Sequence, residues 1–182
     1  MALADVQTEV KTFTAAELYQ RIINDEPTTI VDVRNSEDFS RWGVEGRDSL
    51  KVVNIPYFDF IEEEEESVAK VPAGRDQVFV ICAKEGSSQF VAEILQQHGI
   101  QASYMEGGIN IWRNLYDVRD VVSNRFGRII QVARPARGDL SFVVISEGEA
   151  AVVDPLRHIG HYLEIVRPAD AKLTHIFDTH AH

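Results

Sequence analysis

The chain has 182 residues, a formal net charge of −11 and a single cysteine. Its hydrophobic content of 45% is enough for a packed core, which excludes a wholly disordered chain. No basic stripe offsets the acidic charge, so nucleic acid is excluded as a partner, and one cysteine excludes an internal disulfide.

The sequence predicts a cytoplasmic protein without membrane contact. No apolar stretch reaches 18 residues, and no basic segment precedes an apolar one near the start of the chain. A lone thiol suits a reducing compartment. Residues 62–66 are consecutive glutamates, which we interpret as a solvated loop or helix face rather than a docking patch for a basic partner.

The first part of the chain alternates predicted helices and strands. A capping box of Thr14 and Glu17 opens a helix over residues 14–24, and a second helix is expected over residues 88–98, with Phe90 among its core-facing residues. Apolar or β-branched segments predict strands at residues 29–33, 52–56, 78–81 and 102–105. This alternation predicts an α/β fold with a parallel sheet flanked by helices.

The pattern changes near residue 117, where strands joined by tight turns follow. Strands are expected at residues 129–132, 140–146, 150–153 and 173–178, with a helix over residues 161–166. We therefore predict a domain of residues 1–117, a linker over residues 118–124 and a β-rich segment over residues 125–182.

Cys82 directly follows the buried strand at residues 78–81 and precedes a turn and a helix. Open α/β sheets bind ligands at the carboxyl ends of their strands. The loop of residues 82–88 can direct backbone N–H groups at the sulfur, and the helix adds its positive end, so both favour the nucleophilic thiolate. Position alone is equally compatible with an inert core cysteine.

Five short motifs in the right order resemble the rhodanese family over residues 10–116. They are Asp32-Val33-Arg34, Glu37-Asp38-Phe39, Gly46 with Asn54-Ile55-Pro56, Cys82, and Gly107-Gly108 with Trp112. The resemblance implies that Cys82 is catalytic: it accepts a sulfane sulfur as a persulfide and passes it to a thiol acceptor without a cofactor. It implies a substrate site made of Ala83, Lys84, Glu85, Gly86, Ser87, Ser88 and Arg34.

Two departures from the family pattern narrow this prediction. Ser87 stands where the family loop has arginine, whose guanidinium would bind an oxyanion such as thiosulfate. A small thiol persulfide is therefore the favoured donor over thiosulfate. The related cell-cycle phosphatases also need a loop arginine, so phosphatase activity is excluded. Arg34 is as readily explained by a structural pairing with Asp32 or Glu37 as by a substrate role.

Thr179-His180-Ala181-His182 resembles the start of the metallo-β-lactamase motif, and residues 138–142 and 152–155 resemble the first strands of that superfamily. The resemblance implies that residues 125–182 are the truncated N-terminal part of an αββα domain. His180 and His182 would bind Fe(II) or Zn, with Asp154 nearby, only in an intact domain. Alone, this segment is expected to bind no metal and, through its unpaired strand edges, to favour a homodimer.

The combination resembles persulfide dioxygenase–rhodanese fusions. We therefore predict a rhodanese-type sulfurtransferase that acts in persulfide or sulfide metabolism, from a parent that is also a metal-dependent persulfide dioxygenase or hydrolase. The alternative is a non-catalytic rhodanese-fold binding or regulatory module attached to a metallo-β-lactamase-type hydrolase, and Ser87 favours it.

Overall fold

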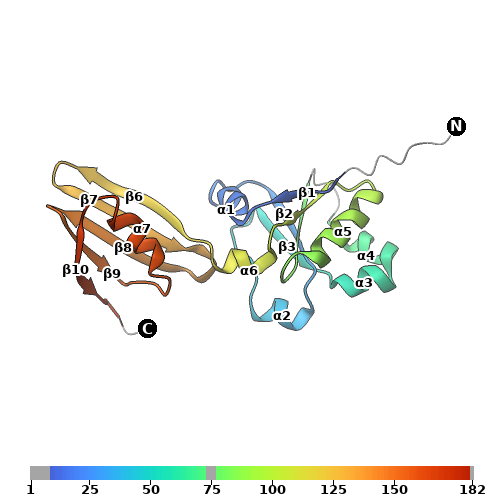
Figure 1. Cartoon of the computed structure of the whole chain (residues 1–182). Coiled ribbons are helices and arrows are strands. Elements are labelled where there is room, and N and C mark those ends of the chain that lie inside the picture. The colour runs from blue at the N-terminus through green and yellow to red at the C-terminus, as the bar shows by residue number, and fades with distance from the viewer. Residues whose placement is uncertain (1–8, 73–76, 181–182) are drawn as a thin grey trace. The chain divides into compact units, whose positions relative to one another are not determined.

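A computed structural model describes residues 9–72 and 77–180 of the chain (Figure 1). The chain divides into two compact units, Met1–Arg113 and Asn114–His182, and each is described by itself. Within the described residues, no helix is long and apolar enough to cross a membrane.

The first unit is built on a parallel sheet with the strand order β1-β5-β4-β2-β3. Its strands are β1 (Lys11–Phe13), β2 (Thr28–Asp32), β3 (Leu50–Asn54), β4 (Val78–Ile81) and β5 (Ala102–Met105). Its helices are α1 (Ala15–Ile23), α2 (Ser36–Arg41), α3 (Tyr57–Glu62), α4 (Glu64–Lys70), α5 (Gly86–Gln97) and α6 (Gly108–Arg113). The predicted α/β fold with a parallel sheet is confirmed.

Helices cover both faces of this sheet, because successive side chains of a strand point to opposite faces. Val31 and Val80 lie in the core cluster that also contains Phe60 of α3 and Leu95 of α5. On the opposite face, the ring of Phe79 lies under α1. Figure 1 shows α1 and α6 on one side of the sheet and α3, α4 and α5 on the other. Both central strands, β2 and β4, are therefore buried along their whole length.

The predicted capping box at the start of α1 is confirmed. Thr14 Oγ1 accepts a hydrogen bond from the backbone N–H of Glu17 at 3.1 Å, and the Glu17 carboxylate accepts one from the backbone N–H of Thr14 at 2.7 Å. The backbone N–H of Thr14, followed by its hydroxyl, holds the pKa of Glu17 below its ordinary value. The helix therefore begins where the sequence indicates.

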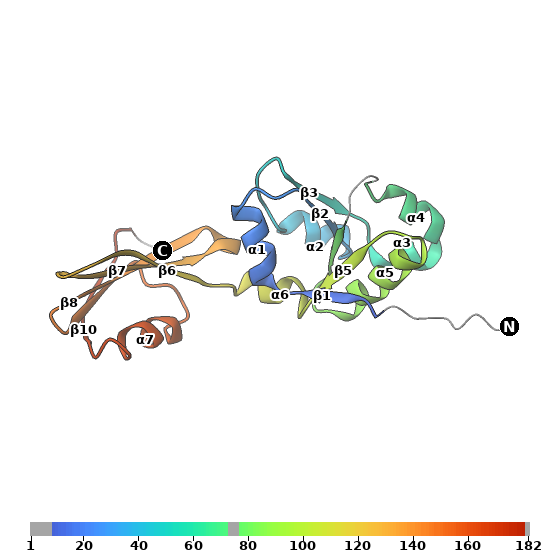
Figure 2. The ribbon, with the colours of Figure 1, turned by 90° about the horizontal axis from the view of Figure 1, so that it is seen from above.

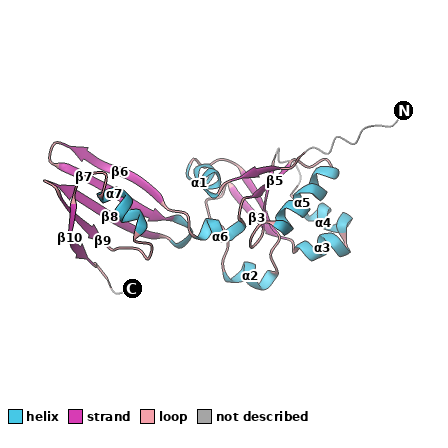
Figure 3. Cartoon of the chain, in the orientation of Figure 1, coloured by secondary structure: helices cyan, strands magenta, loops and turns pink. Residues whose placement is uncertain are grey.

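The second unit is a sheet with the order β10-β9-β8-β7-β6, in which β6 to β9 run antiparallel and β10 runs parallel to β9 (Figure 3). Its elements are β6 (Asp117–Asn124), β7 (Gly127–Arg134), the 3-10 turn η1 (Pro135–Arg137), β8 (Asp139–Ser146), β9 (Glu149–Val153), α7 (Gly160–Val166) and β10 (Lys172–Phe177). Alternate residues of β7 to β9, including Ile130, Val143 and Val152, pack with Tyr162 and Val166. Helix α7 therefore covers one face of the sheet.

Residues 118–124 lie in β6 and do not form the expected linker. Backbone pairing with β7 holds this strand, and the side chains of Asp120 and Arg128 form an ion pair across the two strands at 2.9 Å. The side chains of β6 are exposed on both faces, so they lack the apolar alternation that marks a strand in a sequence. The boundary between the two compact units falls between Arg113 and Asn114 instead.

Candidate active site

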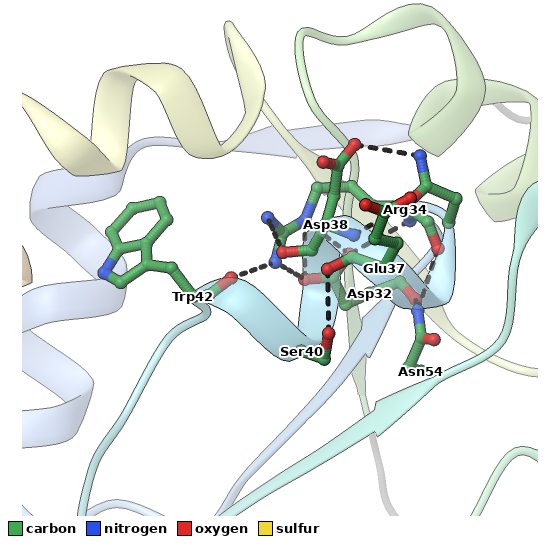
Figure 4. A network of polar contacts seen from close by, with 8 residues as sticks. Asp32, Arg34, Glu37, Asp38, Ser40, Trp42 and Asn54 are labelled. Carbon is green, nitrogen blue, oxygen red and sulfur yellow. Dashed lines mark hydrogen bonds and ion pairs between the residues drawn. The ribbon is translucent and has the colours of Figure 1, made fainter.

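A buried ion pair lies at the carboxyl end of β2, between the last residue of the strand, Asp32, and Arg34 (Figure 4). Asp32 and Arg34 are 1% and 8% exposed, and the Arg34 guanidinium bonds to both carboxylate oxygens of Asp32, with Nη2 at 2.6 Å from Oδ2. Two further guanidinium bonds go to the carbonyl oxygens of Asp38 and Trp42. Asn54 donates to the carbonyl oxygens of Asp32 and Arg34, at 2.8 and 2.9 Å.

These contacts give Arg34 a structural role. The guanidinium donates hydrogen bonds to the buried carboxylate of Asp32 and to the carbonyl oxygens of Asp38 and Trp42. These bonds fix the segment after β2 against α2. Of the two roles that the sequence leaves open for Arg34, the structure shows the pairing with Asp32. Glu37, the other expected partner, pairs with Arg41 instead.

Cys82 stands at the end of β4 and is 5% exposed. Its sulfur lies 3.2 Å from the hydroxyl oxygen of Ser88, which is fully buried in the first turn of α5. The Ser88 hydroxyl donates to the carbonyl oxygen of Glu85 at 2.7 Å. With its proton engaged there, Ser88 Oγ offers a lone pair to the thiol proton of Cys82.

The loop after Cys82 is organised around the carbonyl oxygen of Glu85. The backbone N–H groups of Ser88 and Gln89 donate to that oxygen at 3.0 and 3.1 Å. The sequence predicts that N–H groups of the loop point at the sulfur. These two N–H groups point at the Glu85 carbonyl oxygen instead. The first turn of α5 approaches the sulfur through the Ser88 side chain. Helix α5 packs against β4 and β5, and Figure 2 shows it beside β5.

The turn between β5 and α6 holds the loop from the other side. The backbone N–H of Ile109 donates to the carbonyl oxygen of Cys82 at 2.9 Å, and that of Gly107 donates to the Glu85 carboxylate at 3.1 Å. Gly108 has a φ of +62° and lies so close to the loop that a Cβ atom would be 2.4 Å from the carbonyl oxygen of Lys84. The sequence indicated the Gly-Gly pair as a motif but gave no sign of the contact with Glu85.

Lys84 and Glu85 are the charged residues of this loop. Desolvation, followed by the charges of Glu85, Glu106 and Glu93, raises the pKa of Tyr104 on β5. Of the predicted substrate-binding residues, Ala83, Lys84, Glu85 and Gly86 are exposed, Ser87 is half-buried and Ser88 is buried. The loop therefore presents one basic side chain, Lys84, next to the acidic side chain of Glu85.

The second unit brings His180 and Asp154 together. The Asp154 carboxylate accepts hydrogen bonds from the backbone N–H and the hydroxyl of Thr179, at 2.7 and 2.6 Å, and lies 3.8 Å from His180 Nδ1. His182 lies outside the described residues. Within the described residues, no group of three or more His, Cys, Asp or Glu side chains that could hold a metal ion is found.

Comparisons with known proteins extend this description. The family model of the rhodanese-like domain matches residues 14–115. A rhodanese-like domain protein from Staphylococcus aureus is 29% identical over 57% of this chain and 91% of its own, with a TM-score of 0.45. A rhodanese-related protein from Thermoplasma volcanium is 28% identical over 56% of this chain and 89% of its own, with a TM-score of 0.44. A NAD-dependent persulfide reductase from A. fulgidus is 25% identical over 57% of this chain and 16% of its own, with a TM-score of 0.39.

A comparison with curated proteins gives no match. The family match covers more than half of the chain and spans the Asp32 and Arg34 pair, the Cys82 loop and the turn at Gly108. The chain therefore belongs to the family of proteins with a rhodanese-like domain.

Proposed function

We propose that the protein is a sulfurtransferase that carries sulfane sulfur as a persulfide on Cys82. The observation that carries this proposal is the contact of the Cys82 sulfur with Ser88 Oγ, at the carboxyl end of β4 in a rhodanese-like domain. The Ser88 hydroxyl can accept from the thiol while it donates to the Glu85 carbonyl, and can turn to donate to the thiolate. One side chain thus serves both protonation states of the sulfur.

The first half of the transfer is a thiol–persulfide exchange. The Cys82 thiolate attacks the outer sulfur of a thiol persulfide R–S–SH, a new S–S bond forms on Cys82, and the S–S bond of the donor breaks. The leaving thiolate takes up the proton that Cys82 released, so the products are Cys82–S–SH and R–SH. In the second half, a thiol acceptor attacks the outer sulfur and restores Cys82. No cofactor takes part.

Ser87 and the engagement of Arg34 favour a thiol persulfide over thiosulfate as the donor. A sulfonate group needs fork-like donors such as a guanidinium, and the guanidinium of Arg34 is directed at Asp32 and at backbone carbonyls. A thiol persulfide lacks this group. Persulfide metabolism is therefore the setting that we propose for the protein.

Intact-protein mass spectrometry after incubation with glutathione persulfide or, separately, thiosulfate tests this function. We expect a gain of one sulfur atom from glutathione persulfide, little or none from thiosulfate, and no gain in Cys82→Ser. The alternative is a non-catalytic binding or regulatory module, which the burial of Cys82 and the presence of Ser87 favour. That alternative is correct if neither donor adds sulfur while Cys82 still reacts with an alkylating reagent.

We also propose that residues 125–182 are the N-terminal part of a metallo-β-lactamase-like domain in a parent protein of the persulfide dioxygenase–rhodanese type. The contact of Asp154 with the Thr179-His180 segment supports this proposal, because it holds two residues of the motif at the end of β10. A metal would need ligands beyond this pair. A longer chain that bound neither iron nor zinc would contradict the proposal.

A further inference from the structure

We propose that Glu85 determines the donor specificity of the sulfur site, and that it selects persulfides with a neutral or positively charged remote group over those with a negatively charged one. This inference rests on the sulfurtransferase function proposed above and assigns the class of donor to it.

Glu85 takes part in two contacts of the sulfur loop, one through its backbone and one through its side chain. Its carbonyl oxygen accepts from Ser88 Oγ, which is the atom in contact with the Cys82 sulfur. Its carboxylate accepts from the backbone N–H of Gly107 at 3.1 Å. The side chain of Glu85 is exposed, and the bond to Gly107 holds its carboxylate beside the loop.

The loop itself supplies little positive charge to offset this carboxylate. Lys84 is the one basic residue of residues 82–88, and Ser87 contributes no charge. The guanidinium of Arg34 is engaged with Asp32 and two carbonyl groups. A second carboxylate, Glu106, directly precedes Gly107 and accepts a hydrogen bond from the hydroxyl of Thr12. After desolvation, the charges of Glu85 and Glu106 both raise the pKa of Tyr104.

The negative charge of the Glu85 carboxylate acts on the remote group R of a donor and leaves the chemistry of the sulfur transfer unchanged. The S–S bonds formed and broken are those of the exchange described above, whatever the group R. The charge on R lies several ångströms from a partly solvated carboxylate. At low salt, a donor with a positive charge is therefore expected to react about fivefold faster than one with a negative charge. Specificity for the charge of R therefore follows from the site.

The persulfides of cysteamine, 2-mercaptoethanol and 3-mercaptopropionic acid test this inference, because they carry the same reacting sulfur on a positive, a neutral and a negative remote group. The rate of sulfur gain on Cys82, followed by intact-protein mass spectrometry, is expected to fall in that order in the wild-type protein. Glu85→Gln keeps an oxygen for the Gly107 N–H but removes the charge, so we expect the three rates to converge.

A matched control separates the effect of the Glu85 charge from that of the overall acidity of the protein, and two further measurements test whether the differences in rate are electrostatic. Glu62→Gln removes an exposed carboxylate at the end of α3, outside the loop, and is expected to leave the order unchanged. Lys84→Gln is expected to widen the differences. Raising the salt concentration of the wild-type protein is expected to narrow the differences in rate, which shows that they are electrostatic. Lys84→Gln, which changes the charge of the loop without altering Glu85, covers a Glu85 variant that fails to fold.

The outcomes distinguish this inference from the function on which it rests. If none of the three persulfides adds sulfur to Cys82, the proposed function is wrong and the inference falls with it. If all three add sulfur at equal rates, or if Glu85→Gln keeps the wild-type order of rates, Glu85 does not determine specificity and the sulfurtransferase proposal stands.

Discussion

Gly108 brings the turn between β5 and α6 against the backbone of the sulfur loop. Its φ is +62°, and a Cβ atom there would lie 2.4 Å from the carbonyl oxygen of Lys84 and 2.6 Å from that of Cys82. We expect Gly108→Ala to displace the loop and to slow persulfide formation by about tenfold or more, because a shift of about 1 Å in a reacting group is costly.

The mass-spectrometric assay with glutathione persulfide measures this effect. Gly160→Ala is the matched control, because a Cβ atom at Gly160 would meet no atom within 4 Å, and it is expected to keep the wild-type rate. A wild-type rate in Gly108→Ala would show that the close approach of the turn does not position Cys82.

Single residues also show what the sequence can and cannot predict about the site. Cys82 is identifiable because a buried apolar run ends directly before it. The sequence alone does not decide whether Arg34 binds substrate or stabilises the fold. Its bonds to the carbonyl oxygens of Asp38 and Trp42 depend on the position of α2, which only the structure shows. The contact between Glu85 and Gly107 joins residues far apart in the sequence, and a glutamate followed by glycine carries no local sign of it.

At the scale of elements, the capping box of α1 links stability to pH. The pKa of Glu17 is lowered in the folded protein, so its stabilisation is fully present above the unfolded pKa and is lost as the pH falls through the folded pKa. The difference in unfolding free energy between the wild type and Glu17→Gln is therefore expected to shrink between neutral pH and about pH 3.

Urea unfolding at several pH values measures this difference. Thr14→Ala removes the other half of the box and is expected to cost about 1 kcal/mol, whereas Thr14→Ser keeps the hydroxyl and most of the stability. A difference between the wild type and Glu17→Gln that is constant with pH would contradict the assigned role of the carboxylate.

The elements that the sequence predicts correctly are those with strong apolar patterns. Strands β4 and β5 have the predicted bounds, and the inward stripe of α5 contains Val91 and Leu95. Phe90 is 41% exposed, so its predicted core position is wrong: it lies beside the stripe that Ser88, Val91 and Leu95 form at helical spacing.

Other elements depend on tertiary contacts and carry weak local signals. Strand β1 has three residues and is recognisable only through its pairing with β5. Helix α3 begins after a proline without a side-chain cap, and Phe60 is its one fully buried residue. The glutamates of residues 62–66 lie at the end of α3 and the start of α4 and are exposed, which agrees with a solvated helix face.

At the scale of the whole molecule, we propose that the chain forms a homodimer through the second unit. Among the described strands, β10 is the last of its sheet, and its side chains Ile176 and Phe177 are 60% and 52% exposed. An edge strand with exposed apolar side chains favours pairing with another chain. Sedimentation velocity over a range of protein concentrations is therefore expected to show a dimer.

Ile176→Lys is expected to shift this equilibrium towards the monomer, because it places a charge on the edge strand. Ile111→Lys is the control: Ile111 is 52% exposed on α6 in the first unit and is expected to leave the equilibrium unchanged. A wild-type protein that is monomeric at every concentration would exclude pairing through β10.

The burial of the Cys82 sulfur has a consequence for the order of events in catalysis. A sulfur atom on a side chain that is 5% exposed, at the base of a loop held on both sides, can face one reactant at a time. The spent donor must leave before an acceptor enters, so the kinetics of the proposed transfer are ping-pong. In the proposed transfer, the protein would alternate between a thiol form and a persulfide form of Cys82, and the burial of this side chain would shelter the sulfur between the two half-reactions.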